Sequence, residues 1–306
     1  MSCFGQLPNN ASLLRYNLDD FPVYAAHERL SDHLASRMLV HWHTDFELVH
    51  VRSGCFIYTV DSRSFSMHAG DFLFINARHL HGIEACEGQD CAYSVVLIEP
   101  GILSASPTLQ EKVIAPMLHS DAFPYVLLRG EEANSLSDIT ESIIRAFSAA
   151  QEITSPSRLP ELLLSITASA HQALGLLYPY YLKVEGPSPA AGSRSLQSLR
   201  RMLSFIAEHY PEKLTLAQIA REGHMSPTGC NRLFRQYLQQ TPVAYLLDYR
   251  LDAAASLLLN TEESIASIAL SCGFSQQSYF SRMFVRRYSL SPAAYRKTRD
   301  AQGRRA

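Results

Sequence analysis

A repeated pattern near the carboxyl end is the strongest constraint on how this chain can fold. Two segments share an Ile-Ala pair, a turn, a Ser and an Arg two residues before a Phe: Leu216–Phe234 (LAQIAREGHMSPTGCNRLF) and Ile265–Phe284 (IASIALSCGFSQQSYFSRMF). Arg232 and Arg282 take the same place in the two copies, 50 residues apart. Two copies of helix, short turn with Gly, and helix predict a tandem helix-turn-helix.

The second helix of each copy has an apolar face and a polar face. Intervals of three and four residues predict that Cys230, Leu233, Phe234 and Tyr237, and likewise Tyr279, Phe280, Met283 and Phe284, are buried. The opposite faces consist of Thr228, Asn231 and Arg232 in the first copy and of Gln277, Ser278, Ser281 and Arg282 in the second. Arg reads guanine and Asn or Gln reads adenine in the major groove. We therefore expect these polar residues to contact the bases of double-stranded DNA.

The distribution of charge also separates this region from the rest of the chain. From Arg194 onward there are 16 of the 27 basic and 8 of the 29 acidic residues, a net charge of +8, whereas residues 1–193 carry −10. A basic segment joined to an acidic one indicates that only the basic segment binds a polyanion. Between the two copies, Pro242–Leu259 is long and amphipathic. It predicts a helix that holds the two DNA-contacting helices apart.

Residues from about Leu199 to Thr298 resemble the DNA-binding domain of the AraC family of transcription regulators. The resemblance is carried by RLDAAASLL, SIASIALSCGFSQQSYFSRMF and LSPAAYR, between Arg250 and Arg296. It implies two recognition helices in successive major grooves of promoter DNA, with Thr228, Asn231 and Arg232 in one and Gln277, Ser278, Ser281 and Arg282 in the other. The family has Gly at the end of each recognition helix, where this chain has Gln239 and Ser289. We expect these two helix ends to be strained or differently capped.

The amino-terminal half has the pattern of a different fold. From about Met38 to Leu97, short runs rich in Val, Ile, Phe and Tyr alternate with turn residues and predict an antiparallel barrel or sandwich. The strands expected are Phe46–Arg52, Phe56–Val60, Asp71–Ile75 and Tyr93–Ile98. Residues Glu131–Ala150 and Pro160–Tyr178 then show helical periodicity and predict a helix pair.

Histidines within the predicted barrel form a second motif. The spacing His41-x-His43-x₃-Glu47, followed by Gly70-Asp71 and His81, resembles the two sequence motifs of the cupin fold. In metal-dependent cupins such residues bind a divalent metal. This chain has Ala35 where the first motif has Gly, and Asn76-Ala77 where the second has Pro. We therefore expect His41, His43, Glu47 and His81 to line a pocket for a small-molecule effector, with no metal and no cofactor.

These observations predict an α+β chain of two domains. A cupin-like sensor domain is expected over residues 1–110, and a helical region that forms the dimer surface over 111–183. A linker rich in Pro, Gly and Ser follows over 184–193, and the tandem helix-turn-helix domain covers 194–306. The expected partners are DNA, an unidentified small-molecule effector, a second copy of the chain and RNA polymerase, with no membrane.

Other features limit the class and compartment of the protein. The longest apolar stretch, Leu162–Tyr181, contains Ser, Thr, His and Gln and is too polar to span a bilayer. The first ten residues have no secretory signal, so we expect a cytoplasmic protein. The six cysteines form no CxxC pair and are expected to be free thiols.

The sequence thus favours a ligand-responsive transcription regulator, an activator and not an enzyme. One alternative is a metal-dependent cupin enzyme fused to a DNA-binding domain. Another is a DNA-repair methyl acceptor, which requires an activated Cys next to Pro and His; no cysteine of this chain has that setting. The effector, the operator and the sign of regulation stay open.

Overall fold

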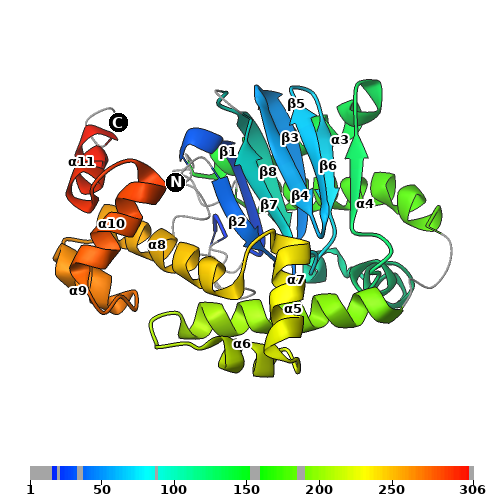
Figure 1. The fold of residues 1–306 in the computed structure, drawn as a ribbon. Helices are drawn as coiled ribbons and strands as arrows, with labels where there is room; N and C mark the ends of the chain where they lie inside the picture. Colours follow the sequence, from blue (N-terminus) through cyan, green and yellow to red (C-terminus); the bar gives the residue numbers. More distant parts are fainter. Residues whose placement is uncertain are drawn as a thin grey trace. The chain divides into compact units, whose positions relative to one another are not determined.

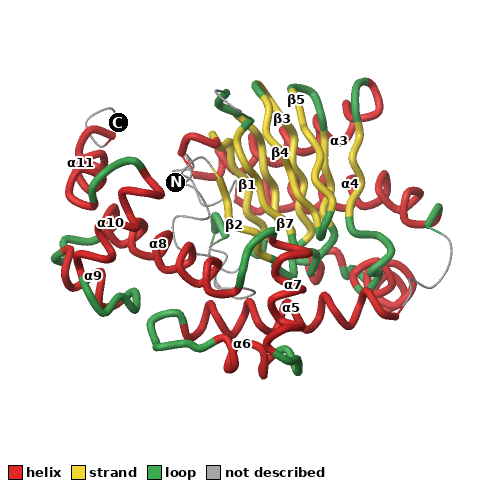
Figure 2. The backbone as a smooth tube through the Cα atoms, in the orientation of Figure 1, coloured by secondary structure: helices red, strands yellow, loops and turns green. Residues whose placement is uncertain are grey.

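The chain folds into two compact units. A computed structural model describes residues 16–18, 21–32, 37–86, 89–151, 159–184 and 190–302. Of these, the residues up to Ser193 belong to one unit and those from Arg194 onward to the other. All strands of the described residues lie in the first unit, and the second contains only helices and their connections (Figure 2).

The first unit is built from nine described strands: β1 (Val23–Arg29), β2 (Arg37–His41), β3 (Phe46–Ser53), β4 (Cys55–Val60), β5 (Arg63–His68), β6 (Phe72–Ile75), β7 (His81–Ala85), β8 (Ala92–Ile98) and β9 (Tyr125–Leu128). They form a five-stranded sheet of order β1-β8-β3-β6-β9 and a four-stranded sheet of order β2-β7-β4-β5. All neighbouring strands are antiparallel.

Alternation along the strands directs side chains either between the two sheets or toward the helices. Phe56 of β4 meets Tyr93 of β8 with ring centroids 5.5 Å apart, so the two sheets face each other. On β3, Phe46 and Leu48 point to the other side, where they join an extended apolar core. Glu47 lies between them in sequence and therefore points into the space between the sheets.

Helices cover the outer face of the five-stranded sheet (Figure 1). The covering helices are α3 (Glu131–Gln151) and α4 (Leu159–Leu182). Buried side chains on their inner faces, such as Ile143, Phe147 and Ile166, belong to the same core as Phe46 and Leu48. Short helical segments precede them: η1 (Leu30–Asp32), η3 (Pro100–Leu103), α1 (Pro107–Leu109), η4 (Gln110–Ile114) and α2 (Ala115–Leu118).

The second unit consists of seven helices among the described residues: α5 (Ala190–His209), α6 (Leu216–Glu222), α7 (Pro227–Leu238), α8 (Pro242–Asn260), α9 (Ile265–Ser271), α10 (Gln277–Tyr288) and α11 (Pro292–Gln302). Helices α6 and α7 form the first helix-turn-helix, and α9 and α10 form the second. Thr215 begins α6 with a reciprocal capping box with Gln218, and Ser226 begins α7 by accepting from the amide of Gly229.

The barrel and the helix pair expected from the sequence are confirmed, with additions. Two strands lie outside the region from about Met38 to Leu97 in which strands were predicted: β1 and β9 form the two edges of the five-stranded sheet. Ala35 and residues 185–189 of the expected linker lie outside the described residues, while Ala190–Ser193 already belong to α5. The side chain of Asn76, where cupins have Pro, donates to the carbonyls of Met117 and Phe123 and so holds the chain before β9.

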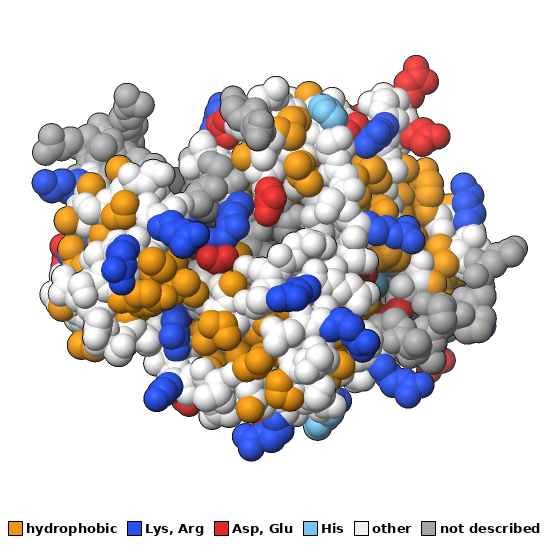
Figure 3. Space-filling model, in the orientation of Figure 1, with side chains coloured by type: hydrophobic (Ala, Val, Ile, Leu, Met, Phe, Trp, Pro, Cys, Tyr) orange, Lys and Arg blue, Asp and Glu red, His pale blue; other side chains and the backbone are white. Residues whose placement is uncertain are grey.

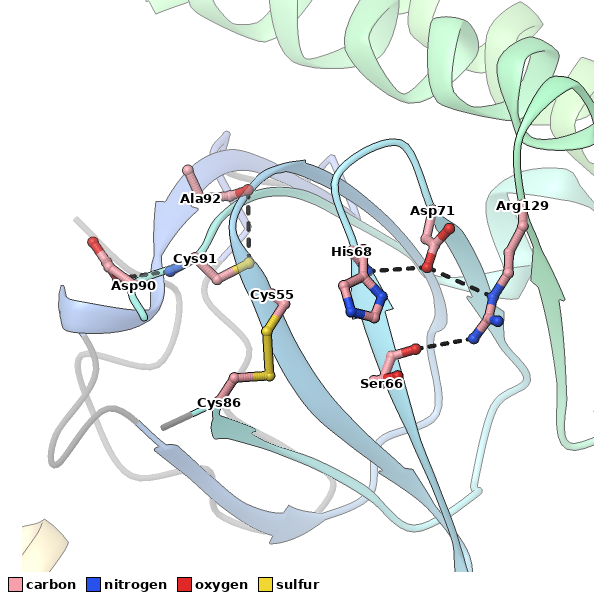
Figure 4. Close-up of a disulfide and its surroundings, with 9 residues drawn as sticks. All are labelled: Cys55, Ser66, His68, Asp71, Cys86, Asp90, Cys91, Ala92 and Arg129. Atoms are coloured by element: carbon pink, nitrogen blue, oxygen red, sulfur yellow. Dashed lines mark hydrogen bonds and ion pairs between the residues drawn. A yellow bond between two sulfur atoms is a disulfide. The ribbon is translucent and has the colours of Figure 1, made fainter. Parts of the chain in front are cut away.

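One expectation about the cysteines is wrong. Cys55 and Cys86 form a disulfide with Cα atoms 6.0 Å apart (Figure 4). The pairing follows from the sheet: Phe56 of β4 lies opposite Ala85 of β7, so the next residues outward, Cys55 and Cys86, are neighbours across the two strands. Thirty-one residues separate the two cysteines, and their spacing alone does not reveal this register. Cys91, Cys230 and Cys272 are buried free thiols.

Candidate functional site

The recognition helix of the first repeat, α7, has the two faces that the sequence predicts. Cys230, Leu233, Phe234 and Tyr237 are all buried. Thr228 and Arg232 are exposed on the opposite side, and Asn231 is half-buried. The Asn231 side chain donates from Nδ2 to the carbonyl of Pro227 at 3.2 Å, within its own helix. The polar face is therefore available to a ligand, with Asn231 the most constrained of the three.

The recognition helix of the second repeat, α10, follows the same plan, except that Tyr279 is exposed and Met283 is only half-buried, although both were expected to be buried. Phe280 and Phe284 are fully buried, whereas Gln277, Ser278 and Arg282 are exposed and Ser281 is half-buried. Tyr279, expected in the core, is 40% exposed, and the Arg282 guanidinium lies over its ring at 5.8 Å. Successive residues of a helix point about 100° apart, so Tyr279 lies to one side of the face that Phe280 and Phe284 bury. Tyr279 therefore supports Arg282 and adds an aromatic ring to the polar face.

The turns of the two repeats have a residue with a positive φ at the same position, but the residue type differs. In the second repeat Gly273 has a φ of +81°, and a Cβ there would lie 2.7 Å from the carbonyl oxygen of Tyr210. In the first repeat the corresponding residue is His224, with a φ of +53°. Its neighbour Gly223 has an ordinary φ of −80° but packs directly against the Met202 side chain. Glycine is thus required in the first turn for packing and in the second for both packing and backbone conformation.

Helix α8 joins the two repeats through polar contacts, several of them partly buried, that sequence patterns did not reveal. Arg250 of α8 donates to the carbonyls of Tyr210 and Glu212, in the segment between α5 and α6. Arg287 of α10 forms ion pairs with Asp248 and Asp252 of α8. The ion pairs of Arg287 fix α10 on α8.

On the visible surface of the helical unit, basic side chains predominate over acidic ones (Figure 3).

The histidine motif of the first unit assembles into one buried cluster. His41 ends β2 and lies opposite His81 at the start of β7, while His43 follows in the connection between β2 and β3. The centroids of the His41 and His81 rings are 4.4 Å apart, and those of His43 and His81 are 4.7 Å apart. Glu47 comes from β3 in the opposite sheet. All four side chains predicted for the site therefore meet.

Glu47 is the centre of this cluster. Its Oε2 lies 3.2 Å from Nε2 of His43 and 3.0 Å from Nε2 of His81. The hydroxyl of Tyr58 on β4 donates to Oε1 at 2.9 Å. Tyr58 was not predicted, although its inward position on a strand facing β3 is the signal that could have found it. These four residues and His41 are at most 4% exposed.

The electrostatics of the cluster follow from burial and from the close approach of unlike groups. Burial acts to raise the pKa of Glu47, but His81 and His43 outweigh it, so that this pKa lies below its usual value. Burial acts to lower the pKa of His43, whereas the hydrogen bond and charge of Glu47 raise it above its usual value. Burial and the neighbouring His81 and His43 hold the pKa of His41 well below its ordinary value. The cluster therefore contains the ionised carboxylate of Glu47 and the neutral imidazole of His41.

A second polar cluster, on the outer face of the five-stranded sheet, was missed by the sequence. Glu141 of α3 accepts from the Ser94 hydroxyl of β8 at 2.5 Å and contacts Nδ1 of His50 on β3 at 3.0 Å. Nε2 of His27 on β1 lies 3.7 Å from its other oxygen. The cluster ties α3 to three strands. Each residue comes from a different element, so no local motif marks it.

Family comparisons agree with this two-part architecture. Residues 22–167 match the AraC-like ligand-binding domain, and residues 219–298 match a helix-turn-helix domain. Over 94% of this chain, the sequence is 26% identical to the uncharacterised transcriptional regulator YdeC of Bacillus subtilis, 96% of which is covered. It is 25% identical to the transcriptional activator RhaS of Citrobacter koseri over 94% of this chain and 98% of that protein.

Solved structures show the same fold. The structure of wild-type ToxT from Vibrio cholerae with a bound unsaturated fatty acid superposes with a TM-score of 0.50, at 15% identity, over 92% of this chain and 96% of that one. A ligand-binding domain joined to a helix-turn-helix domain defines a DNA-binding regulator. The chain belongs to the AraC family of transcription regulators. Among its described helices, none is long and apolar enough to cross a membrane.

Proposed function

We propose that this regulator activates transcription by reading promoter DNA with α7 and α10 in successive major grooves. The base-contacting residues would be Thr228, Asn231 and Arg232 of α7 and Gln277, Ser278, Ser281 and Arg282 of α10. The observation that carries this proposal is the pair of recognition helices with matching exposed polar faces, each fixed by buried aromatic residues.

The connecting helix has a suitable length for this role. Helix α8 has 19 residues and extends about 28 Å. Successive major grooves on one face of B-DNA are separated by about 34 Å. Arg287 holds α8 to α10, and Arg250 holds it to the α5–α6 segment. A helix of this length, fixed in this way, suits two recognition helices that bind one face of the duplex.

The first unit is proposed to be the sensor. An effector bound at His41, His43, Glu47 and His81 would favour one arrangement of the DNA-binding units over another. We place the protein in the cytoplasm, and RNA polymerase is the proposed partner of the activated state. We assign it no enzymatic activity, since its relatives over nearly the full chain are regulators.

A homodimer is proposed to form through α4. There is no Asp, Glu, Lys or Arg between Glu161 and Lys183. The outward face of the helix exposes Leu164 by 72% and Leu182 by 62%. A contiguous uncharged face of this kind typically marks an interaction surface. Sedimentation would show a dimer for the wild type and a monomer for Leu164→Asp, whereas Ser135→Asp on exposed α3 surface would stay dimeric.

The experiment that tests the function is DNA binding by the purified full chain, with promoters identified by mapping its bound sites across the genome. The helical unit carries a net charge of +8, and we expect the logarithm of the binding constant to fall with the logarithm of salt concentration with a slope of about −4 to −5. A response that does not depend on salt, or no enrichment at any promoter, would contradict the proposal.

A further inference from the structure

The arrangement of the three histidines is that of a ligand set for a single ion. His41, His43 and His81 each offer one ligand atom, and these atoms lie within 4.8 Å of one another. The centre of such a triangle lies about 2.8 Å from each corner, so each nitrogen need move only about 0.7 Å to reach a metal–nitrogen distance of about 2.1 Å. Changes of that size need only small rotations of the rings.

Main-chain carbonyls fix which nitrogen of each ring faces the cluster. Nδ1 of His41 lies 3.0 Å from the Leu39 carbonyl, Nδ1 of His43 lies 3.1 Å from that of Asp45, and Nδ1 of His81 lies 2.9 Å from that of His79. A carbonyl oxygen can only accept, so each Nδ1 carries its hydrogen. In the neutral ring, Nε2 then presents a lone pair. Donation of the second ring N–H to a carbonyl is the usual outer-sphere arrangement of metal-binding histidines.

Glu47 adds a fourth ligand atom with negative charge. Its Oε2 lies 3.2 Å or less from Nε2 of both His43 and His81, so one carboxylate oxygen and two ring nitrogens converge on the same small region. A positive charge among these atoms stabilises the arrangement: a proton on Nε2 supplies it in the metal-free protein, and a bound cation can take the place of that proton. The hydrogen bond from Tyr58 orients the other carboxylate oxygen and leaves Oε2 directed at the histidines.

The cluster is better suited to an ion than to an organic molecule. Its members are at most 4% exposed, and the histidine rings are in mutual contact, with centroids 4.4 to 5.8 Å apart. A drug-sized ligand requires a preformed cavity of about 300 Å³ or more. One ion among four converging side chains requires none.

We infer that His41, His43, His81 and Glu47 bind one divalent first-row transition-metal ion, and that this ion is the effector of the regulator. Three imidazole nitrogens and one carboxylate oxygen suit Zn²⁺, Fe²⁺, Co²⁺ or Ni²⁺, and the absence of a thiolate ligand disfavours Cu⁺. The inference rests on the proposed function, in which the barrel is the sensor. It departs from the sequence-based expectation of a metal-free pocket because the three carbonyl contacts are visible only in the structure.

Metal binding is tested with the untagged full-length chain. We expect elemental analysis to find one transition-metal ion per chain, and the metal-stripped protein to bind one Co²⁺ with visible absorption bands that Zn²⁺ abolishes. His41→Ala and His81→Ala should weaken Co²⁺ binding at least about 100-fold. His68→Ala, which removes an exposed histidine of the same unit, should leave the affinity unchanged.

A variant that keeps the shape of the site guards against misfolding. Glu47→Gln retains an oxygen for the Tyr58 hydroxyl and loses only the charge, so it should bind Co²⁺ about 10-fold more weakly with an unchanged circular-dichroism spectrum. A folded wild-type chain that binds no ion, or binds it equally well in all three site variants, would overturn the inference.

The effector role is tested separately by DNA binding. We expect promoter affinity or transcription to differ at least about 5-fold between metal-loaded and metal-stripped protein, and the difference to vanish in His81→Ala. Metal binding without any such difference overturns the effector role. Promoter binding that is specific but indifferent to metals leaves the proposed function standing, whereas loss of promoter binding in both states contradicts the proposed function itself.

Discussion

Arg287 of α10 donates three hydrogen bonds to the carboxylate of Asp252 on α8. Nη2 lies 2.6 Å from Oδ1 and 2.8 Å from Oδ2, and Nε lies 2.9 Å from Oδ1. The hydroxyl of Tyr288 donates to the same carboxylate. This ion pair connects the second recognition helix to the helix that carries it, and neither partner belongs to the repeat that predicted the fold.

Asp252→Ala should destabilise the helical unit by about 3–5 kcal/mol, because it leaves the guanidinium of Arg287 buried without its main partner. Urea unfolding measures the loss. Asp248→Ala removes a more exposed partner of the same guanidinium and should cost only about 1 kcal/mol. An equal loss of unfolding free energy in the two variants would show that burial of the carboxylate does not determine how much each ion pair stabilises the protein.

Gln239→Gly and Ser289→Gly should each stabilise the protein by about 0.5–1 kcal/mol. Gln239 has a φ of +56° and Ser289 a φ of +57°, both in the left-handed region where a side chain is strained. The strain expected at these helix ends is therefore present in the structure. Gln236→Gly, within α7, is the matched control and should cost about 1 kcal/mol. Thermal unfolding distinguishes the two signs.

Arg232→Ala and Arg282→Ala should each remove about 1–3 kcal/mol of specific DNA binding without altering stability, because both arginines are exposed and each is proposed to hold a base. Arg235→Ala and Arg286→Ala remove exposed charges from the same helices and should weaken binding to all sequences alike. Competition with unrelated DNA separates the two effects. If the first pair lost no discrimination between operator and unrelated DNA, the base-contact assignment would be wrong.

Glu141→Gln should destabilise the first unit at neutral pH and have little effect in acid. Partial burial acts to raise the pKa of Glu141, but hydrogen bonds from Ser94 and His50 bring this pKa below its usual value. A carboxyl whose pKa is lowered by folding contributes stability above its unfolded pKa of about 4.3, and loses it as the pH falls through the folded value. We expect a difference of about 1–2 kcal/mol near pH 7 that shrinks below about pH 4. Melting temperatures measured from pH 3 to 7 would show it, and a difference independent of pH would rule out the ionised carboxylate as its source.

The sequence predicted the local parts of this protein well. Phe234 and Phe284 mark the buried face of each recognition helix because helical periodicity places residues three and four apart on one side. The strands that contain Glu47 and Tyr58 were likewise visible as apolar runs. His41, His43, Glu47 and His81 were chosen because their pattern resembles the cupin motifs, and the structure brings all four together.

What only the tertiary structure decided are the contacts between residues that are distant in the sequence. The Cys55–Cys86 disulfide depends on the register of β4 with β7, and the Glu141 cluster depends on α3 lying over three strands. The pair Arg287–Asp252 joins two residues that are 35 positions apart in the sequence and lie on different helices. Periodicity is a property of one segment and survives in the sequence, whereas register and helix placement arise from packing between segments, which no single segment encodes.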